Sequence, residues 1–221
     1  MKKDQLRHSR QFQPIFEQYA ATSIEELQEN PKVLGMGKRI FLSNCATCHG
    51  SDGGGAFGFP RLNDNNWLWG GNPEDIKTAV LYGRRGQMPA WGPILGVQGV
   101  KDTAAYTRYL GGLDVSENDG RLDNGKTVYE SMCAVCHGLD GKGNKLLGAP
   151  NLTDDSWVYG NTQVQVEYTI RKGRNGVMPA WLDILGPEKS HIVSAYVYSL
   201  SREQRKLSVS EIVSENIEPT K

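Results

Sequence analysis

The residues with the most evident chemistry are four cysteines in two pairs, each pair followed directly by a histidine. The two sets are Cys45, Cys48 and His49, and Cys133, Cys136 and His137. This Cys-x-x-Cys-His pattern is typical of covalent haem c attachment. Two cysteines three residues apart lie on one side of a helical turn, so both sulfurs can reach one porphyrin while the adjacent imidazole ligates the iron. The pattern predicts two covalently bound haem c groups.

Three other roles for the cysteine pairs fit less well. A thioredoxin-like redox pair needs a βαβ context, which this sequence does not suggest. Structural zinc takes four ligands, whereas each set offers two cysteines and a histidine too close to the second cysteine for easy tetrahedral closure. A disulfide within each pair would leave the histidine and the following glycine unexplained. Haem attachment is therefore the favoured interpretation.

The two motifs belong to a longer internal repeat. The repeated segments are 45–50 and 133–138, 60–67 and 150–157, and 83–91 and 173–181. The offset between copies grows from 88 to 90 because the second copy has two more residues in its glycine-rich loop, within 140–148. The chain is therefore a duplicated domain.

The sixth iron ligand should occupy the same place in both copies. The methionines are Met1, Met36, Met88, Met132 and Met178. Only Met88 and Met178 are equivalent in the repeat, and each precedes a proline, which restrains the methionine to an extended backbone. Methionine opposite histidine also raises the reduction potential relative to two nitrogen ligands. We therefore predict Met88 and Met178 as axial ligands, with His49 and His137 on the opposite side of each iron.

Other repeated side chains have expected roles around the haems. Trp67, Trp157, Trp91 and Trp181 are predicted to form pocket walls. Arg84 and Arg174 are either partners of a haem propionate or solvated loop residues, and the sequence does not decide between the two. Tyr106 and Tyr196 are predicted to pack the terminal helices on the faces that carry Gly37 with Phe41 and Gly125 with Tyr129. His8 and His191 have no counterpart in the repeat and are given no axial role.

Helices account for all the elements that we expect. The predicted helices are one from Asn30-Pro31 towards Phe41, two short ones at about Pro73–Leu81 and Val164–Lys172, and two terminal ones at about Lys101–Leu110 and Glu188–Leu200. No alternating run is long enough to predict a strand. The expected fold class is all-α.

The repeat also divides the chain. The predicted segments are an N-terminal segment at 1–32, a first domain at 33–112, a linker at 113–123, a second domain at 124–200 and a polar tail at 201–221. The linker is acidic. Over the whole chain 25 Lys and Arg balance 25 Asp and Glu, so charge gives no support to nucleic-acid binding. The longest mostly apolar stretch, near His191–Leu200, is far shorter than the ~20 residues of a membrane-spanning helix.

The haem motif followed by a late Met-Pro resembles class I cytochromes c. A closer resemblance rests on the segment 62–71, on the tandem Gly-Arg-x-Gly-x-Met-Pro-Ala-Trp motifs and on Pro14–Ala20. From about Phe12 to Leu200 the sequence is similar to the dihaem subunit (subunit III) of cbb3-type cytochrome c oxidases. The resemblance implies two tandem class I cytochrome c domains, each with one covalent haem c. It also implies thioether bonds at Cys45, Cys48, Cys133 and Cys136, with His49 and Met88 on one iron and His137 and Met178 on the other.

The same resemblance implies a function. Such a subunit relays electrons on the periplasmic side of the bacterial inner membrane, from a soluble cytochrome c or similar donor to the other oxidase subunits, which reduce oxygen. By itself it is an electron-transfer subunit rather than an enzyme. The family has a membrane anchor ahead of the first haem domain, so we expect this chain to be the soluble part of an anchored protein rather than a naturally soluble homologue. The alternatives are a free dihaem electron shuttle and, less favoured, a dihaem peroxidase.

Overall fold

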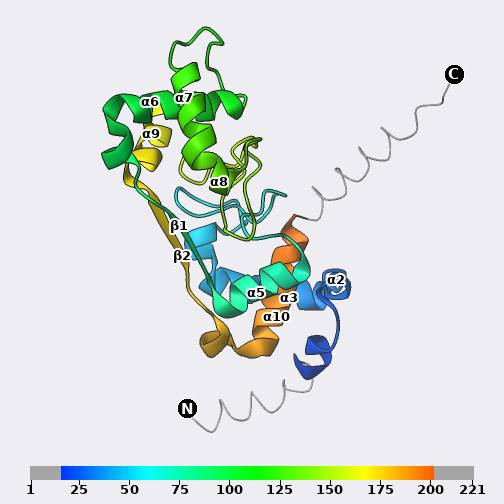
Figure 1. The fold of residues 1–221 in the computed structure, drawn as a ribbon. Helices are drawn as coiled ribbons and strands as arrows, with labels where there is room; N and C mark the ends of the chain where they lie inside the picture. The colour runs from blue at the N-terminus through cyan, green and yellow to red at the C-terminus, as the bar shows by residue number, and fades with distance from the viewer. Residues whose placement is uncertain (1–15, 202–221) are drawn as a thin grey trace, which may run out of the picture.

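The computed structural model describes residues 16–201; residues 1–15 and 202–221, which include His8 and nearly all of the predicted polar tail, lie outside the described part. The described chain is mostly helical (Figure 1). Its elements are α2 (Ile24–Leu27), α3 (Pro31–Asn44), α4 (Ala46–His49), α5 (Pro73–Tyr82), β1 (Arg84–Met88), α6 (Gly92–Leu110), α7 (Leu122–Val128), the π-helical η1 (Tyr129–Cys133), α8 (Ala134–His137), α9 (Gln163–Lys172), β2 (Arg174–Met178) and α10 (Leu182–Leu200).

The predicted helices are confirmed, and local chemistry explains where they begin. Asn30 caps α3, because its side-chain oxygen accepts the backbone N–H of Lys32 at 3.0 Å, and Pro31 fills the first helical position. Thr162 and Gln165 form a capping box at the start of α9. The helix α3 ends at Asn44, so it delivers Cys45 directly to the haem motif.

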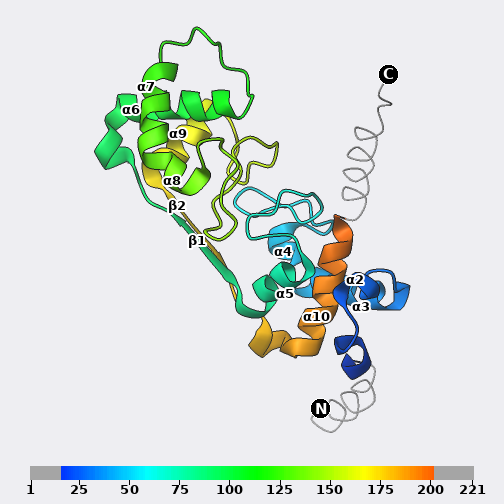
Figure 2. The same ribbon diagram turned by 45° about the vertical axis from the view of Figure 1, so that its right-hand side comes forward.

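The helices form two lobes, and each lobe takes its last helix from the other copy of the repeat. We call the group α2, α3, α4, α5 and α10 the first lobe, and the group α6, α7, η1, α8 and α9 the second lobe. In the first lobe α10 packs on α3 and α5, and in the second α6 packs on α7 and α9 (Figures 1 and 2). The predicted boundaries at 33–112 and 124–200 therefore describe the sequence copies, whereas each packed lobe combines both.

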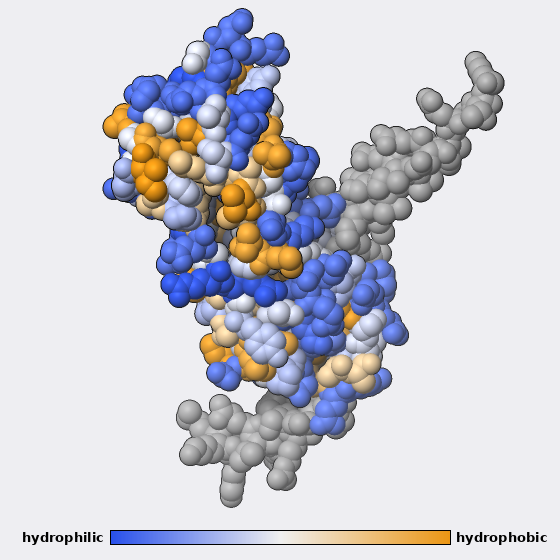
Figure 3. Space-filling view, viewed as in Figure 1, coloured by the Kyte–Doolittle hydropathy of each residue, from blue (hydrophilic) through white to orange (hydrophobic). Residues whose placement is uncertain are grey.

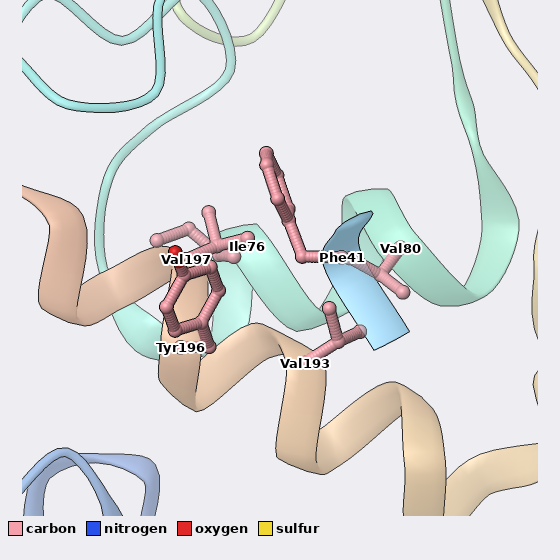
Figure 4. Packing of buried hydrophobic residues seen from close by; sticks show 6 residues of the cluster. All are labelled: Phe41, Ile76, Val80, Val193, Tyr196 and Val197. Atoms are coloured by element: carbon pink, nitrogen blue, oxygen red, sulfur yellow. The ribbon is translucent and has the colours of Figure 1, made fainter. Parts of the chain in front are cut away.

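Glycines allow the exchanged helices to come close. A Cβ atom at Gly37 of α3 would lie 2.5 Å from the Cβ of Tyr196 in α10, which leaves room only for glycine. Next to this contact the rings of Tyr196 and Phe41 lie 5.5 Å apart, in a buried cluster with Val193 of α10 (Figure 4). In the second lobe the same packing places Tyr106 against Gly125 and Tyr129. The predicted faces are right, but each tyrosine packs on the face of the other copy.

A two-stranded antiparallel ribbon joins the lobes. Strands β1 and β2 pair with Gly86 opposite Gly176 at the centre, and the ribbon runs along one side of the molecule between the lobes (Figure 2). The prediction that the chain has no strand is therefore wrong. The five-residue strands contain arginine and glycine and have little strand propensity of their own. Each strand pairs with the equivalent strand of the other copy, with Gly86 opposite Gly176. Past the ribbon, α6 and α10 are kinked at Gly96 and Gly186, which have φ of 64° and 74°.

Polar contacts also connect the lobes. The Ser156 hydroxyl donates to the Asp64 carboxylate at 3.0 Å, and the Gly58 backbone N–H donates to the Val158 carbonyl at 2.8 Å. The ring of Phe57 meets the ring of Tyr159 edge-on at 6.0 Å.

Within residues 16–201, no helix combines the length and the apolar composition that crossing a bilayer requires.

Candidate haem-binding sites

The two motif histidines are buried, and both are oriented by a main-chain carbonyl. His49 ends α4 and His137 ends α8, each with 8% of its surface exposed. The Nδ1 atom of His49 lies 3.0 Å from the carbonyl oxygen of Pro60, and that of His137 lies 3.1 Å from the carbonyl oxygen of Pro150. With Nδ1–H donating to a carbonyl, Nε2 is the nitrogen free to ligate a metal.

Burial keeps these imidazoles in the ligating form. It lowers the pKa of both His49 and His137, while the hydrogen bond to the proline carbonyl acts in the opposite direction and is the smaller effect. A neutral imidazole is the form that binds iron. Both histidines are therefore prepared as ligands in the folded chain.

The glycine-rich loops place the two carbonyls. Gly55 donates its N–H to the His49 carbonyl at 2.8 Å and has a φ of 74°. A Cβ atom at position 55 would lie 2.8 Å from the carbonyl oxygen of Phe59, so the loop can adopt this conformation only with glycine at that position. Gly143 makes the same bond to His137 in the second copy. The repeated glycines thus fold each loop back so that the following proline faces the histidine.

None of the four motif cysteines forms a disulfide bond. Burial, and to a smaller extent the neighbouring Cys48, raise the pKa of Cys45 to about 11. The same two causes raise the pKa of Cys133 to about 11. Redox-active cysteine pairs need a lowered thiol pKa, so these environments do not suit a thioredoxin-like function.

The two methionines lie in the lobe opposite to the one that we expected. Met178 packs on the first-lobe cluster around Phe41, which also contacts Cys45. Met88 packs in the second lobe on the cluster that includes Val166 and Ile170. The expected pairing of His49 with Met88 and of His137 with Met178 is therefore not the one that the structure brings together. Each lobe combines the cysteines and histidine of one copy with the methionine of the other.

The ribbon explains this exchange. Its register sets Met178 opposite Arg84 at the first-lobe end and Met88 opposite Arg174 at the other. Each strand leaves the lobe of its own copy and delivers its methionine to the partner lobe. Alternate residues of both strands are half-buried, including the arginine, the glycine and the methionine of the motif.

The residues around each site fit a haem c. In the first lobe Trp67 and Trp181 pack with Met178 on the apolar cluster, and in the second lobe Trp91 and Trp157 pack with Met88. Each lobe thus offers two cysteine side chains, an imidazole with its Nε2 available, a thioether and apolar walls. Among residues 16–201 no cluster of three or more His, Cys, Asp or Glu forms an all-protein metal site.

The two sites are neighbours across the lobe interface. Pro60 and Pro150, whose carbonyls hold the two histidines, line a single cavity of about 150 Å³ together with Trp67, Lys142 and Lys145. The sides of the sites that carry the histidines therefore meet where the lobes touch.

Sequence reasoning missed the ribbon and the aromatic residues that cross between lobes. Tyr159 contacts Phe57, and Trp69 packs against Gly148 of the other copy. A signal for the ribbon was present, because the arginine, glycine and methionine that recur in both copies stand at alternate positions, which is the period of a strand. His191, which has no counterpart in the repeat, has its Nε2 atom 2.8 Å from the Thr22 carbonyl oxygen, as suits a buried residue on a helix face.

Comparison with known proteins identifies the family of the chain. Residues 34–106 and 120–197 match the family model described as cytochrome C oxidase, cbb3-type, subunit III. The chain is 40% identical over 193 residues to the cbb3-type cytochrome c oxidase subunit FixP of Azorhizobium caulinodans, an alignment that covers 82% of this chain and 66% of the relative. It is 39% identical to subunit CcoP of Rubrivivax gelatinosus, with 87% and 62% covered.

The chain thus spans somewhat less than two thirds of the length of these relatives. The match to the family model includes both Cys-x-x-Cys-His motifs and both Met-Pro motifs. The chain belongs to the family of cbb3-type cytochrome c oxidase subunit III.

Proposed function

We propose that the chain is a dihaem c-type cytochrome that relays electrons within a cbb3-type oxidase complex. The observation that carries this proposal is the pair of equivalent sites whose two histidine-holding prolines line one cavity. Cys45 and Cys48 attach one haem c and Cys133 and Cys136 the other. His49 and Met178 ligate the first iron, and His137 and Met88 ligate the second.

When bound, the haems supply reversible one-electron chemistry. The protein residues set the conditions for it. The Pro60 and Pro150 carbonyls fix the imidazoles, and Met178 and Met88 would fill the remaining ligand position of each iron, so no position would be open to a substrate. A thioether ligand favours a higher potential than a second nitrogen would. These features suit electron transfer rather than catalysis.

The family resemblance supports a proposal for the partners and the location. We infer that electrons come from a soluble cytochrome c or similar donor, pass through both haems, and reach the other oxidase subunits on the periplasmic side of the membrane. The relatives are FixP and CcoP subunits of cbb3-type oxidases, which supports a place for this chain among the other oxidase subunits.

The test uses membranes of the source organism solubilised in mild detergent. An antibody to the chain should detect it in the native-gel band that consumes oxygen. Replacing Cys133 and Cys136 by alanine should abolish oxygen consumption from a reduced soluble cytochrome while the band keeps its other subunits. Detection of the wild-type chain only in the soluble periplasmic fraction would instead assign it as a free shuttle.

A peroxidase would behave differently, because it needs one iron with an open sixth position. The reduced protein should not bind carbon monoxide rapidly, since Met88 and Met178 would each fill the ligand position that carbon monoxide needs. Rapid stoichiometric binding at one haem would contradict the relay.

A further inference from the structure

Arg84 is a cation with one buried donor that has no acceptor. Its Nη2 donates to the Asp75 carbonyl at 3.2 Å, and its guanidinium carbon lies 5.4 Å from the centre of the Trp69 ring. Its Nε is buried, and no acceptor for it exists in the described part of the chain. Buried N–H groups of native proteins are nearly always bonded, and a guanidinium bonds most strongly to a carboxylate.

This arginine belongs to the first site. It starts β1 and stands opposite Met178 in the ribbon. Its carbonyl partner, Asp75, lies on α5 of the first lobe. Met178 in turn packs on the cluster that contacts Cys45. The unbonded Nε is thus in the lobe that holds His49 and beside the methionine of that lobe.

The equivalent arginine of the second site is already bonded. The Nε and Nη2 of Arg174 both donate to the Thr169 hydroxyl, at 3.1 and 2.7 Å. Its guanidinium also stacks on Tyr159 at 4.0 Å and on Tyr168 at 5.1 Å. In the first copy the residue equivalent to Thr169 is Ala79, which has no hydroxyl. The two arginines therefore differ although the motif around them is the same.

We infer that Arg84 binds a propionate of the haem in the first lobe, whereas Arg174 is held by Thr169 and acts less on the second haem. The inference rests on the proposed function, since it requires both haems. A propionate is the anionic group that a haem brings to an otherwise apolar pocket. The cation beside the first haem favours Fe(II) over the more positive Fe(III), so Arg84 raises the first reduction potential relative to the second.

The test is a spectroelectrochemical titration of the purified dihaem protein. The variant M178H identifies the first haem, because it replaces the thioether and lowers the potential of that haem alone. R84Q should lower the first potential by about 59 mV, a tenfold change in the Fe(II) to Fe(III) ratio at fixed potential, and leave the second unchanged. R174Q should shift the second potential by less than half as much.

A matched variant keeps every charge. A79T gives Arg84 the hydroxyl that Arg174 already has, and it should lower the first potential by less than R84Q does. If R84Q does not fold, A79T still tests the inference. An unchanged reduction potential of the first haem in A79T overturns it. R84Q protein that holds two haems and shows no shift, or an equal shift of both, overturns it as well. A wild-type chain without haem, or without methionine-ligated iron, would contradict the proposed function instead.

Discussion

At the scale of single residues, the ligand chemistry depends on partners that belong to the main chain. The carbonyls of Pro60 and Pro150 orient the two histidines, and neither bond can be read from side-chain types. The motif identifies the cysteines, histidines and methionines as candidates, because their spacing carries the chemistry. It does not identify which methionine faces which histidine, since the two copies offer the same residues to either site.

The crossed ligation can be tested with a one-haem protein. Replacing Cys45 and Cys48 by alanine should remove the first haem and leave the second attached to Cys133 and Cys136. In that background Met88→Ala should abolish the absorption band of thioether-bound Fe(III). Met178→Ala should leave the band intact, because Met178 packs in the other lobe. The opposite result, with the band lost in Met178→Ala and kept in Met88→Ala, would show that each haem takes its methionine from its own copy.

Asp154 allows a test of pH dependence. Burial raises its pKa above the usual value, the nearby Asp155 and Asp64 raise it further, and the hydrogen bond from the Ser156 N–H opposes them. In the window above the ordinary carboxyl pKa of 3.8, the folded state therefore holds this proton more tightly than the unfolded state, and stability falls as the pH rises.

Asp154→Asn keeps an acceptor for the Ser156 N–H and removes the charge. At pH 7 we expect a small gain in the free energy of unfolding, about 0.5 kcal/mol or less. The gain should vanish as the pH falls through the raised pKa towards 3.8. Thermal melts across this range measure it, with Asp114→Asn in the exposed part of the linker as the control. A gain that does not depend on pH would rule out the carboxylate charge as its cause.

At the scale of elements, the fold depends on how closely the exchanged helices approach. Gly37 lets α3 and α10 touch at their backbones, and Gly125 does the same for α7 and α6. The sequence predicts these helices well, because Asn30, Pro31 and the capping box at Thr162 mark where they begin. It does not predict the ribbon, whose strands have weak β propensity and pair across 90 residues.

Two glycines of one helix provide a matched test of this contact. Gly37→Ala places a methyl group 2.5 Å from the Tyr196 Cβ and 2.8 Å from the Ile192 carbonyl oxygen. Because neither atom can move without shifting α10, we expect a loss of about 1–3 kcal/mol or more in the free energy of unfolding. Gly35→Ala meets only the end of the Arg39 side chain at 3.9 Å and should be neutral or slightly stabilising. Denaturant unfolding of both variants measures the difference, and equal losses would contradict the tight crossing.

At the scale of the whole molecule, the repeat alone leaves two arrangements open. Tyr106 and Tyr196 have equivalent partners in both copies, so each terminal helix can pack on its own copy or on the other with the same contacts. The repeat boundaries therefore follow from the sequence, but the composition of the lobes does not. The structure resolves this in favour of exchange, with α10 in the first lobe and α6 in the second.

Cutting the linker tests the exchange. With a protease site inserted within 113–123, we expect the two fragments to stay together as a one-to-one complex on gel filtration after cleavage. Each lobe contains helices from both fragments, so the fragments should separate only when the protein unfolds. A cut protein whose fragments separate under native conditions would contradict the exchanged helices. An uncut sample with the same insertion is the control.

The exchange also sets an order of events during synthesis. The second lobe consists of residues 92–172, and the Met88 that it uses precedes them, so its polypeptide is complete while the last helix has still to be made. The first lobe begins earlier in the chain, yet it needs Met178 and α10, which ends at Leu200. Chains are made from the N-terminus. The candidate haem pocket whose cysteines emerge first is therefore the one that closes last.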